Sequence, residues 1–226
     1  MEDFQLLETM LYERSIGFYL LEPHLNRLTQ SASYFSEESN DNSFVNCTTS
    51  DFREFIKANL QESVKNIGDD KRRIVRLTVD KQGVPNISTF AFQPIQDTQP
   101  TLSSNKFLYH KTTKRDMYND ARIRVGLESK EDLFDVVMYN EKHEITECSI
   151  ANIAVQCYDA ENNVKFWKTP QIECGLLGGT MRSQLIENGD IIPSIISLDD
   201  IKLAQQQGRK IKCFNSVKKV YEAILV

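Results

Sequence analysis

The sequence is poor in the residues that build metal sites and disulfide frameworks. Its 226 residues include three histidines and five cysteines, and these lack the CxxC pairs and the short His spacing of a zinc site. The cysteines are too scattered for a disulfide scaffold; they stand at Cys47, Cys148, Cys157, Cys174 and Cys213. We therefore expect reduced thiols and a mechanism that uses no metal ion.

An excess of basic residues is also missing, as is a long apolar run. The formal net charge is −5 at pH 7, whereas proteins that neutralise a nucleic-acid backbone gather Lys and Arg on one face. No apolar run approaches the roughly 20 residues that cross a bilayer, and the start MEDFQLLETM has no signal-peptide character. We expect a cytoplasmic protein that binds neither nucleic acid nor membrane.

The first 95 residues have the pattern of a small α/β lobe, in which β-like runs alternate with helical spacing. Apolar residues recur at Leu21, Leu25, Leu28 and Ala32, which is typical of an amphipathic helix. The expected elements are strands at 4–12 and 16–21, a helix from 21 to 32, a surface loop over 35–50, a helix over 52–64, and strands at 73–79 and 87–92.

A proline-containing stretch with little to pack predicts a linker over residues 96–106. The part that follows, residues 107–226, is expected to be a larger β-rich lobe. Its expected elements are a strand ending near His110, a helix at 116–124, strands at 135–139, 151–158 and 164–167, a helix from the 175–179 turn to 187, and strands at 210–214 and 220–226. The predicted fold class is mixed α/β (α+β) in two lobes.

Lys111 is the first residue with a potential chemical role. It follows a short apolar run and precedes an expected helix, so its side chain can enter an interior cleft. A lysine that is partly removed from water has a lowered pKa and can form an imine with an aldehyde. Most lysines are solvated surface charges, so the residue taken alone favours the surface interpretation.

Two further segments suit a bound anion and a buried carboxylate. The run GGTMR, from Gly178, stands where a loop becomes a helix, and the first N–H groups of a helix bind anions; such a turn is more often only a flexible joint. In an expected half-buried strand, Glu147 faces the side opposite Thr146 and Cys148. Glu147 is then either an exposed edge residue or an inward carboxylate that needs a charged or proton-sharing partner.

The order and spacing of these segments resemble the fold type IV pyridoxal-phosphate enzymes, which include branched-chain aminotransferases, D-amino acid aminotransferases and aminodeoxychorismate lyases. The resemblance covers nearly the whole chain. It rests on LLETML, LEPHLNRLTQSA, HKTTKRDMYNDAR, NEKHEITECSIANI, GLLGGTMR and FNSVKK. It implies pyridoxal 5'-phosphate as cofactor, bound by the lobe over residues 107–226. It also implies a small-molecule substrate and a homodimer as the oligomeric state.

The resemblance also implies roles for individual residues. Lys111 matches the catalytic lysine that holds the cofactor covalently, and Glu147 matches the carboxylate that keeps the pyridine nitrogen protonated, so that the ring can accept electrons. The implied cofactor-binding residues are Arg27, Lys111, Glu147, Asn152, Gly179, Thr180 and Met181. The implied substrate-binding residues are Arg115, Asn215 and Ser216.

Within this family, HKTT, TECSIAN and GTMR are most similar to aminodeoxychorismate lyase, which gives p-aminobenzoate and pyruvate for folate synthesis. Three positions depart from common family forms: Gly178 replaces a proline, Lys114 an asparagine and Lys218 an arginine. The chain is also expected to lack the leading strand of many members. Two alternatives stay open, a class IV amino-acid aminotransferase and a non-catalytic binding protein on the same fold.

Overall fold

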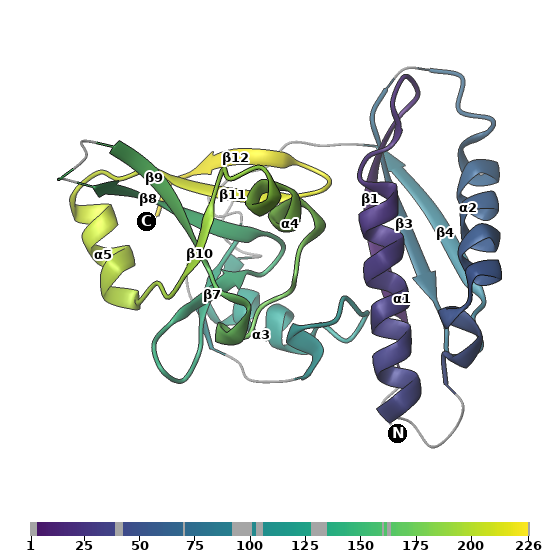
Figure 1. Cartoon of the computed structure of the whole chain (residues 1–226), viewed down its shortest axis with the longest axis horizontal. Helices are drawn as coiled ribbons and strands as arrows, with labels where there is room; N and C mark the ends of the chain where they lie inside the picture. Colours follow the sequence, from purple (N-terminus) through teal and green to yellow (C-terminus); the bar gives the residue numbers. More distant parts are fainter. Residues whose placement is uncertain are drawn as a thin grey trace. The chain divides into compact units, whose positions relative to one another are not determined.

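The computed structural model describes residues 4–38, 43–69, 71–91, 101–102, 106–127, 135–159, 161 and 164–225. The chain forms two compact units. The first consists of Met1–Gln93 with His110–Lys114, and the second of Pro94–Tyr109 with Arg115–Val226. Helices and several sheets occur in the chain (Figure 1), which confirms the predicted α/β class. The division at residues 96–106 stays a prediction, and most of that linker lies outside the described residues.

The first unit is built on a four-stranded antiparallel sheet with the order β2-β1-β3-β4 (Figure 1). Helix α1 packs against β1, and helix α2 packs against β4. The bounds are β1 Leu6–Glu13, β2 Gly17–Phe18, α1 Leu21–Glu38, the 3-10 helix η1 Val45–Thr48, α2 Ser50–Val64, β3 Arg73–Val79 and β4 Pro85–Ala91.

The apolar spacing in the sequence places both helices of this unit. Along α1 the buried apolar side chains are Leu25, Leu28, Ala32 and Phe35, and they recur every three or four residues as one helix face requires. Helix α2 follows the same rule and is capped by Thr49, whose side chain accepts a hydrogen bond from the Phe52 N–H at 3.1 Å.

The predicted surface loop over 35–50 is wrong in its described residues. Helix α1 continues to Glu38, and η1 occupies Val45–Thr48. The reason is two aromatic side chains among polar neighbours: Phe35 and Phe44 are both buried, and their ring centroids lie 6.3 Å apart. Burial of two rings outweighs the polar composition of the segment.

The second unit contains a five-stranded sheet with the order β10-β9-β8-β11-β12 and a three-stranded sheet with the order β5-β6-β7. The strands are β5 Thr101–Leu102, β6 Val137–Tyr139, β7 Ile145–Cys148, β8 Asn152–Asp159, β9 Val164–Pro170, β10 Ile192–Ser194, β11 Ile211–Asn215 and β12 Lys219–Ala223. The helices are η2 Lys106–Leu108, α3 Asp116–Arg124, η4 Ile172–Cys174, α4 Thr180–Glu187 and α5 Leu198–Gln206.

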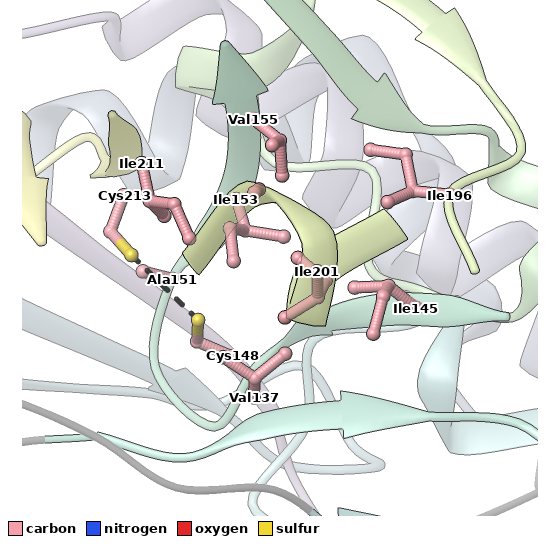
Figure 2. Close-up of a cluster of buried hydrophobic side chains, with 11 residues drawn as sticks. Val137, Ile145, Cys148, Ala151, Ile153, Val155, Ile196, Ile201, Ile211 and Cys213 are labelled. Carbon is pink, nitrogen blue, oxygen red and sulfur yellow. Dashed lines mark hydrogen bonds between the residues drawn. The ribbon is translucent and has the colours of Figure 1, made fainter. Parts of the chain in front are cut away.

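A cluster of buried aliphatic side chains and two thiols forms a core of this unit (Figure 2). Strands β7, β8 and β11 and helix α5 contribute to it. The Sγ atoms of Cys148 and Cys213 lie 3.8 Å apart within the cluster, and all five cysteines are free thiols. Among the described residues, no helix is both long and apolar enough to cross a membrane.

The sequence assigns one segment of this unit to the wrong element and leaves one of its helices unpredicted. The predicted strand before His110 is the short 3-10 helix η2 instead, and Phe107 and Leu108 are buried there. Helix α5 was not predicted, because it buries only Ile201 and Ala204. Its start is stabilised by a capping box between Ser197 and Asp200.

Candidate active site

Lys111 belongs to the first unit, in a segment that continues the sheet beside the first residues of β1. The Lys111 carbonyl accepts a hydrogen bond from the Leu7 N–H at 2.9 Å. The Thr113 N–H donates to the Gln5 carbonyl at 2.9 Å, and the Gln5 N–H donates to Thr113 Oγ1 at 2.9 Å. These backbone bonds hold the half-buried lysine at a fixed place next to β1.

A buried ionic cluster lies in the same unit and joins β1 to α1. Glu8 Oε1 accepts from Arg27 Nε at 2.9 Å, and Glu8 Oε2 accepts from Arg27 Nη2 at 2.5 Å. His24 Nδ1 lies 2.5 Å from Glu8 Oε2. Burial opposes ionisation of Glu8, but the charge of Arg27 and the hydrogen bonds of the cluster outweigh it and lower the pKa of Glu8 to about 2.

His24 is fully buried, and the positive charge of Lys111 acts on its imidazole. Burial lowers the pKa of His24, and the positive charges of Arg27 and Lys111 act in the same direction, against the attraction of Glu8. We therefore assign a neutral imidazole at neutral pH, with its Nδ1–H donated to Glu8.

Glu147 lies on β7 in the second unit, and its side chain is buried. Its Oε1 accepts from the Tyr118 hydroxyl at 2.7 Å and from the Leu177 N–H at 3.0 Å. Its Oε2 accepts from Asn152 Nδ2 at 3.3 Å. These three donors satisfy the carboxyl group in the interior, and Arg115 and Arg182 interact with it electrostatically. Burial, followed by the negative charge of Glu147, raises the pKa of Tyr118 well above its usual value.

The strand that carries Glu147 differs from the half-buried strand that the sequence predicts. All four residues of β7 are buried, so both of its faces pack against protein. The strand ends at Cys148, because the Cys148 N–H bonds to the Ala151 carbonyl at 2.8 Å in a turn. The inward position of Glu147 therefore comes from burial of the whole strand.

Asn152 links Glu147 to the start of helix α4. Its Nδ2 also donates to the Leu177 carbonyl at 2.9 Å, and its Oδ1 would lie 2.0 Å from a Cβ atom on Gly179. Any side chain at this position would therefore have to displace the Asn152 amide. Gly179 is the N-cap of α4, no side chain caps the helix, and Thr180 and Met181 of its first turn are buried. The helix start has the polarity that favours an anion.

The structure thus brings five predicted cofactor residues of the second unit together: Glu147, Asn152, Gly179, Thr180 and Met181. The other two, Arg27 and Lys111, are both in the first unit. Their roles toward a cofactor stay predictions. Among the described residues, no group of three or more His, Cys, Asp or Glu side chains is arranged to hold a metal ion.

The predicted substrate residues Arg115 and Asn215 meet at the loop that follows β7. Arg115 Nη2 donates to the Ser149 carbonyl at 2.6 Å, and Asn215 Nδ2 donates to the Ile150 carbonyl at 3.0 Å. The Arg115 guanidinium also lies over the Tyr118 ring, 4.8 Å from its centroid. These contacts order the loop, and Ser216 is buried next to Asn215; substrate binding by the three residues is untested.

Sequence reasoning missed Glu8, His24 and Tyr118. Two signals were available for the first pair: Glu8 is a carboxylate in the otherwise apolar strand LLETML, and His24 and Arg27 are three residues apart on one helix face. Nothing in the sequence around Tyr118 indicates its hydrogen bond to Glu147, because the two residues are 29 positions apart.

The mixed α/β fold is that of an enzyme family. The family described as Amino-transferase class IV matches residues 5–221, and the chain belongs to this family. The match confirms the resemblance that the sequence motifs indicate.

Two curated relatives and one solved structure illustrate the likeness. A candidate aminodeoxychorismate lyase of Schizosaccharomyces pombe is 29% identical over 100% of this chain and 91% of its own length. The aminodeoxychorismate lyase of Saccharomyces cerevisiae is 28% identical over 94% of this chain and 69% of its own length. A candidate amino-acid aminotransferase from Mesorhizobium loti is similar in structure, with a TM-score of 0.78 and 26% identity over 99% of this chain and 100% of that one.

Proposed function

We propose that the protein is a pyridoxal-phosphate-dependent 4-amino-4-deoxychorismate lyase, which releases p-aminobenzoate and pyruvate in folate precursor synthesis. Membership of the class IV family and the names of the two curated relatives support this assignment. The observation that carries it is Glu147, a buried carboxylate with three uncharged donors, linked through Asn152 to a helix start where any side chain would have to displace the Asn152 amide.

The residues fit the three polar parts of the proposed cofactor. The start of α4 at Gly179 suits a phosphate, because a glycine lets an anion approach the backbone closely. We assign to Arg27 the cation that a phosphate requires. Glu147 suits a protonated ring nitrogen, and Lys111 suits the aldehyde. When bound, this cofactor provides an electron sink for a carbanion.

Lys111 has two tasks in this proposal. Its Nζ would hold the cofactor covalently at the aldehyde. With substrate bound, the free Lys111 amine would take the proton from the amine-bearing carbon of the substrate. The C–O bond to the enolpyruvyl group breaks as the ring becomes aromatic, the enolpyruvate takes up a proton to become pyruvate, and p-aminobenzoate is the other product. Glu147 would face the ring nitrogen, with Tyr118, the Leu177 N–H and Asn152 as its own donors.

The substrate carries two carboxylates, so cationic or amide contacts must hold it. We assign this task to Arg115, Asn215 and Ser216. Arg115 donates to the Ser149 carbonyl and Asn215 to the Ile150 carbonyl, which fixes where their side chains lie. We also propose a cytoplasmic homodimer, for which light scattering would give twice the protomer mass of 26.0 kDa.

A class IV amino-acid aminotransferase is the second candidate. The likeness to the Mesorhizobium loti structure over 99% of this chain favours it. In that reaction the same lysine would move the proton onward, a keto acid would leave, and an acceptor keto acid would be needed to complete the cycle.

Product formation with and without an acceptor separates the two candidates. Purified protein loaded with pyridoxal 5'-phosphate is incubated with aminodeoxychorismate alone, and separately with pairs of amino and keto acids. We expect p-aminobenzoate without any acceptor and none with Lys111→Ala, while Lys142→Ala, at an exposed lysine, keeps full activity. Turnover that occurs only with an amino and keto acid pair would replace the lyase by the aminotransferase.

A further inference from the structure

The cluster of Glu8, His24 and Arg27 has a geometry that packing alone does not require. Glu8 is 1% exposed, and a carboxylate in the interior is expensive unless it is paired and hydrogen-bonded. Here both of its oxygens are used, one by Arg27 Nε and the other by Arg27 Nη2 and His24 Nδ1. Burying these charged and polar groups costs desolvation free energy that an apolar core would not cost.

The contact between Glu8 and Arg27 is the two-pronged pairing of a carboxylate with one edge of a guanidinium. A guanidinium is planar and has five N–H donors in fixed directions. Fixing one edge therefore fixes the directions of all the others. The Arg27 side chain is only 12% exposed, so the contact sets the orientation of a cation that solvent hardly reaches.

His24 completes the arrangement from the same face of α1. It is three residues before Arg27, and its Nδ1 also lies 3.4 Å from Arg27 Nη2. As a neutral donor it holds Glu8 Oε2 without adding charge. Arg27 and His24 therefore both bind the Glu8 carboxylate, which fixes the position of Glu8 on β1 relative to Arg27 on α1.

We propose that Glu8 is a positioning residue, which orients the Arg27 guanidinium toward the phosphate ester of the cofactor. This inference rests on the proposed function, in which Arg27 binds that phosphate. Glu8 itself touches neither substrate nor cofactor in the proposal. Its contribution is orientation: without Glu8, Arg27 has to give up the freedom of a long side chain when the phosphate binds.

Comparison of two ligands that differ only in the phosphate tests this role. Apoprotein is titrated with pyridoxal 5'-phosphate and with pyridoxal, and the absorbance of the covalent adduct on Lys111 reports binding. We expect Glu8→Gln to weaken binding of the phosphate ester by about tenfold and to leave pyridoxal binding unchanged. Glu37→Gln, at an exposed position on α1, serves as the matched control and changes neither affinity.

A double-mutant cycle distinguishes positioning through Arg27 from a general effect on the fold. Arg27→Ala should lose the same preference for the phosphate ester, and adding Glu8→Gln should bring no further loss. If Glu8→Gln does not fold, Glu8→Asp keeps the charge but shortens the reach and should show the same selective loss. Equal weakening of both ligands, or additive losses in the double variant, would overturn the proposal. A wild-type protein that binds neither ligand would instead refute the cofactor assignment, and this proposal with it.

Discussion

Replacement of Gly179 by alanine tests whether the Asn152 amide needs a glycine at the start of α4. A Cβ atom at this position would lie 2.0 Å from Asn152 Oδ1 and 3.2 Å from Asn152 Cγ. Real side chains do not approach so closely, so the Asn152 amide must move away. The backbone at Gly179 has φ −66° and ψ 138°, which alanine adopts without strain. The whole effect therefore comes from the displaced amide.

The displaced amide gives up two hydrogen bonds, at 3.3 Å to Glu147 and at 2.9 Å to the Leu177 carbonyl. Each is worth about 1 kcal/mol net, and a buried acceptor left without a partner adds about 1 kcal/mol or more. We expect Gly179→Ala to lower the free energy of unfolding by about 2–4 kcal/mol. It should also weaken cofactor binding, because the start of α4 and Glu147 share the displaced amide.

Urea denaturation and cofactor titration measure both effects. The control is Gly178→Ala, because a Cβ atom there meets only Ile172 Cδ1 at an ordinary 3.7 Å. In an Asn152→Ala background the obstacle is gone, so Gly179→Ala should then be nearly neutral. The reasoning is refuted if Gly179→Ala is as stable as Gly178→Ala, or if its penalty is undiminished in the Asn152→Ala background.

Three further predictions follow from single side chains. Tyr118→Phe removes one donor from buried Glu147 and should lower the free energy of unfolding by about 1–3 kcal/mol, which urea denaturation measures; an unchanged midpoint would contradict the hydrogen bond. Burial lowers the pKa of Lys218 from 10.5 to about 8, so between pH 8 and 10.5 the unfolded chain binds more protons at this residue. Stability should rise with pH there, and Lys218→Met should flatten that rise in denaturation curves across the range. Burial raises the pKa of Cys47 to about 12, so a disulfide reagent at neutral pH should modify half-buried Cys157 first and Cys47 only after unfolding; peptide mapping that finds Cys47 modified early would oppose this.

The sequence predicts elements best where periodicity and turn residues agree. Strand β3 and helix α3 have the predicted bounds, Arg73–Val79 and Asp116–Arg124. Helix α5 was missed because only two of its side chains are buried, too few for a periodic signal. The segment before His110 was assigned to a strand because its apolar run is too short to separate a strand from a 3-10 turn.

The candidate site could be predicted only in part, and the limit is physical. Motif order indicates Lys111, Glu147 and Gly179, because each stands at a recognisable junction between elements. Pairing between distant residues leaves no local pattern. The contact of Glu8 with Arg27 spans 19 positions and that of Tyr118 with Glu147 spans 29, and both depend on which faces the folded elements present.

The place of the lysine segment in the chain affects the order in which the first unit can fold. Gln5 and Thr113 are hydrogen-bonded across 108 positions. The chain enters the second unit at Pro94 before His110–Lys114 returns to the first. The start of β1 pairs with β3 on one side, so its other edge lacks a partner until residues 111–113 have been made. Closing so long a loop is slow, so we expect the backbone of Lys111 to reach its place beside β1 late in the folding of the first unit.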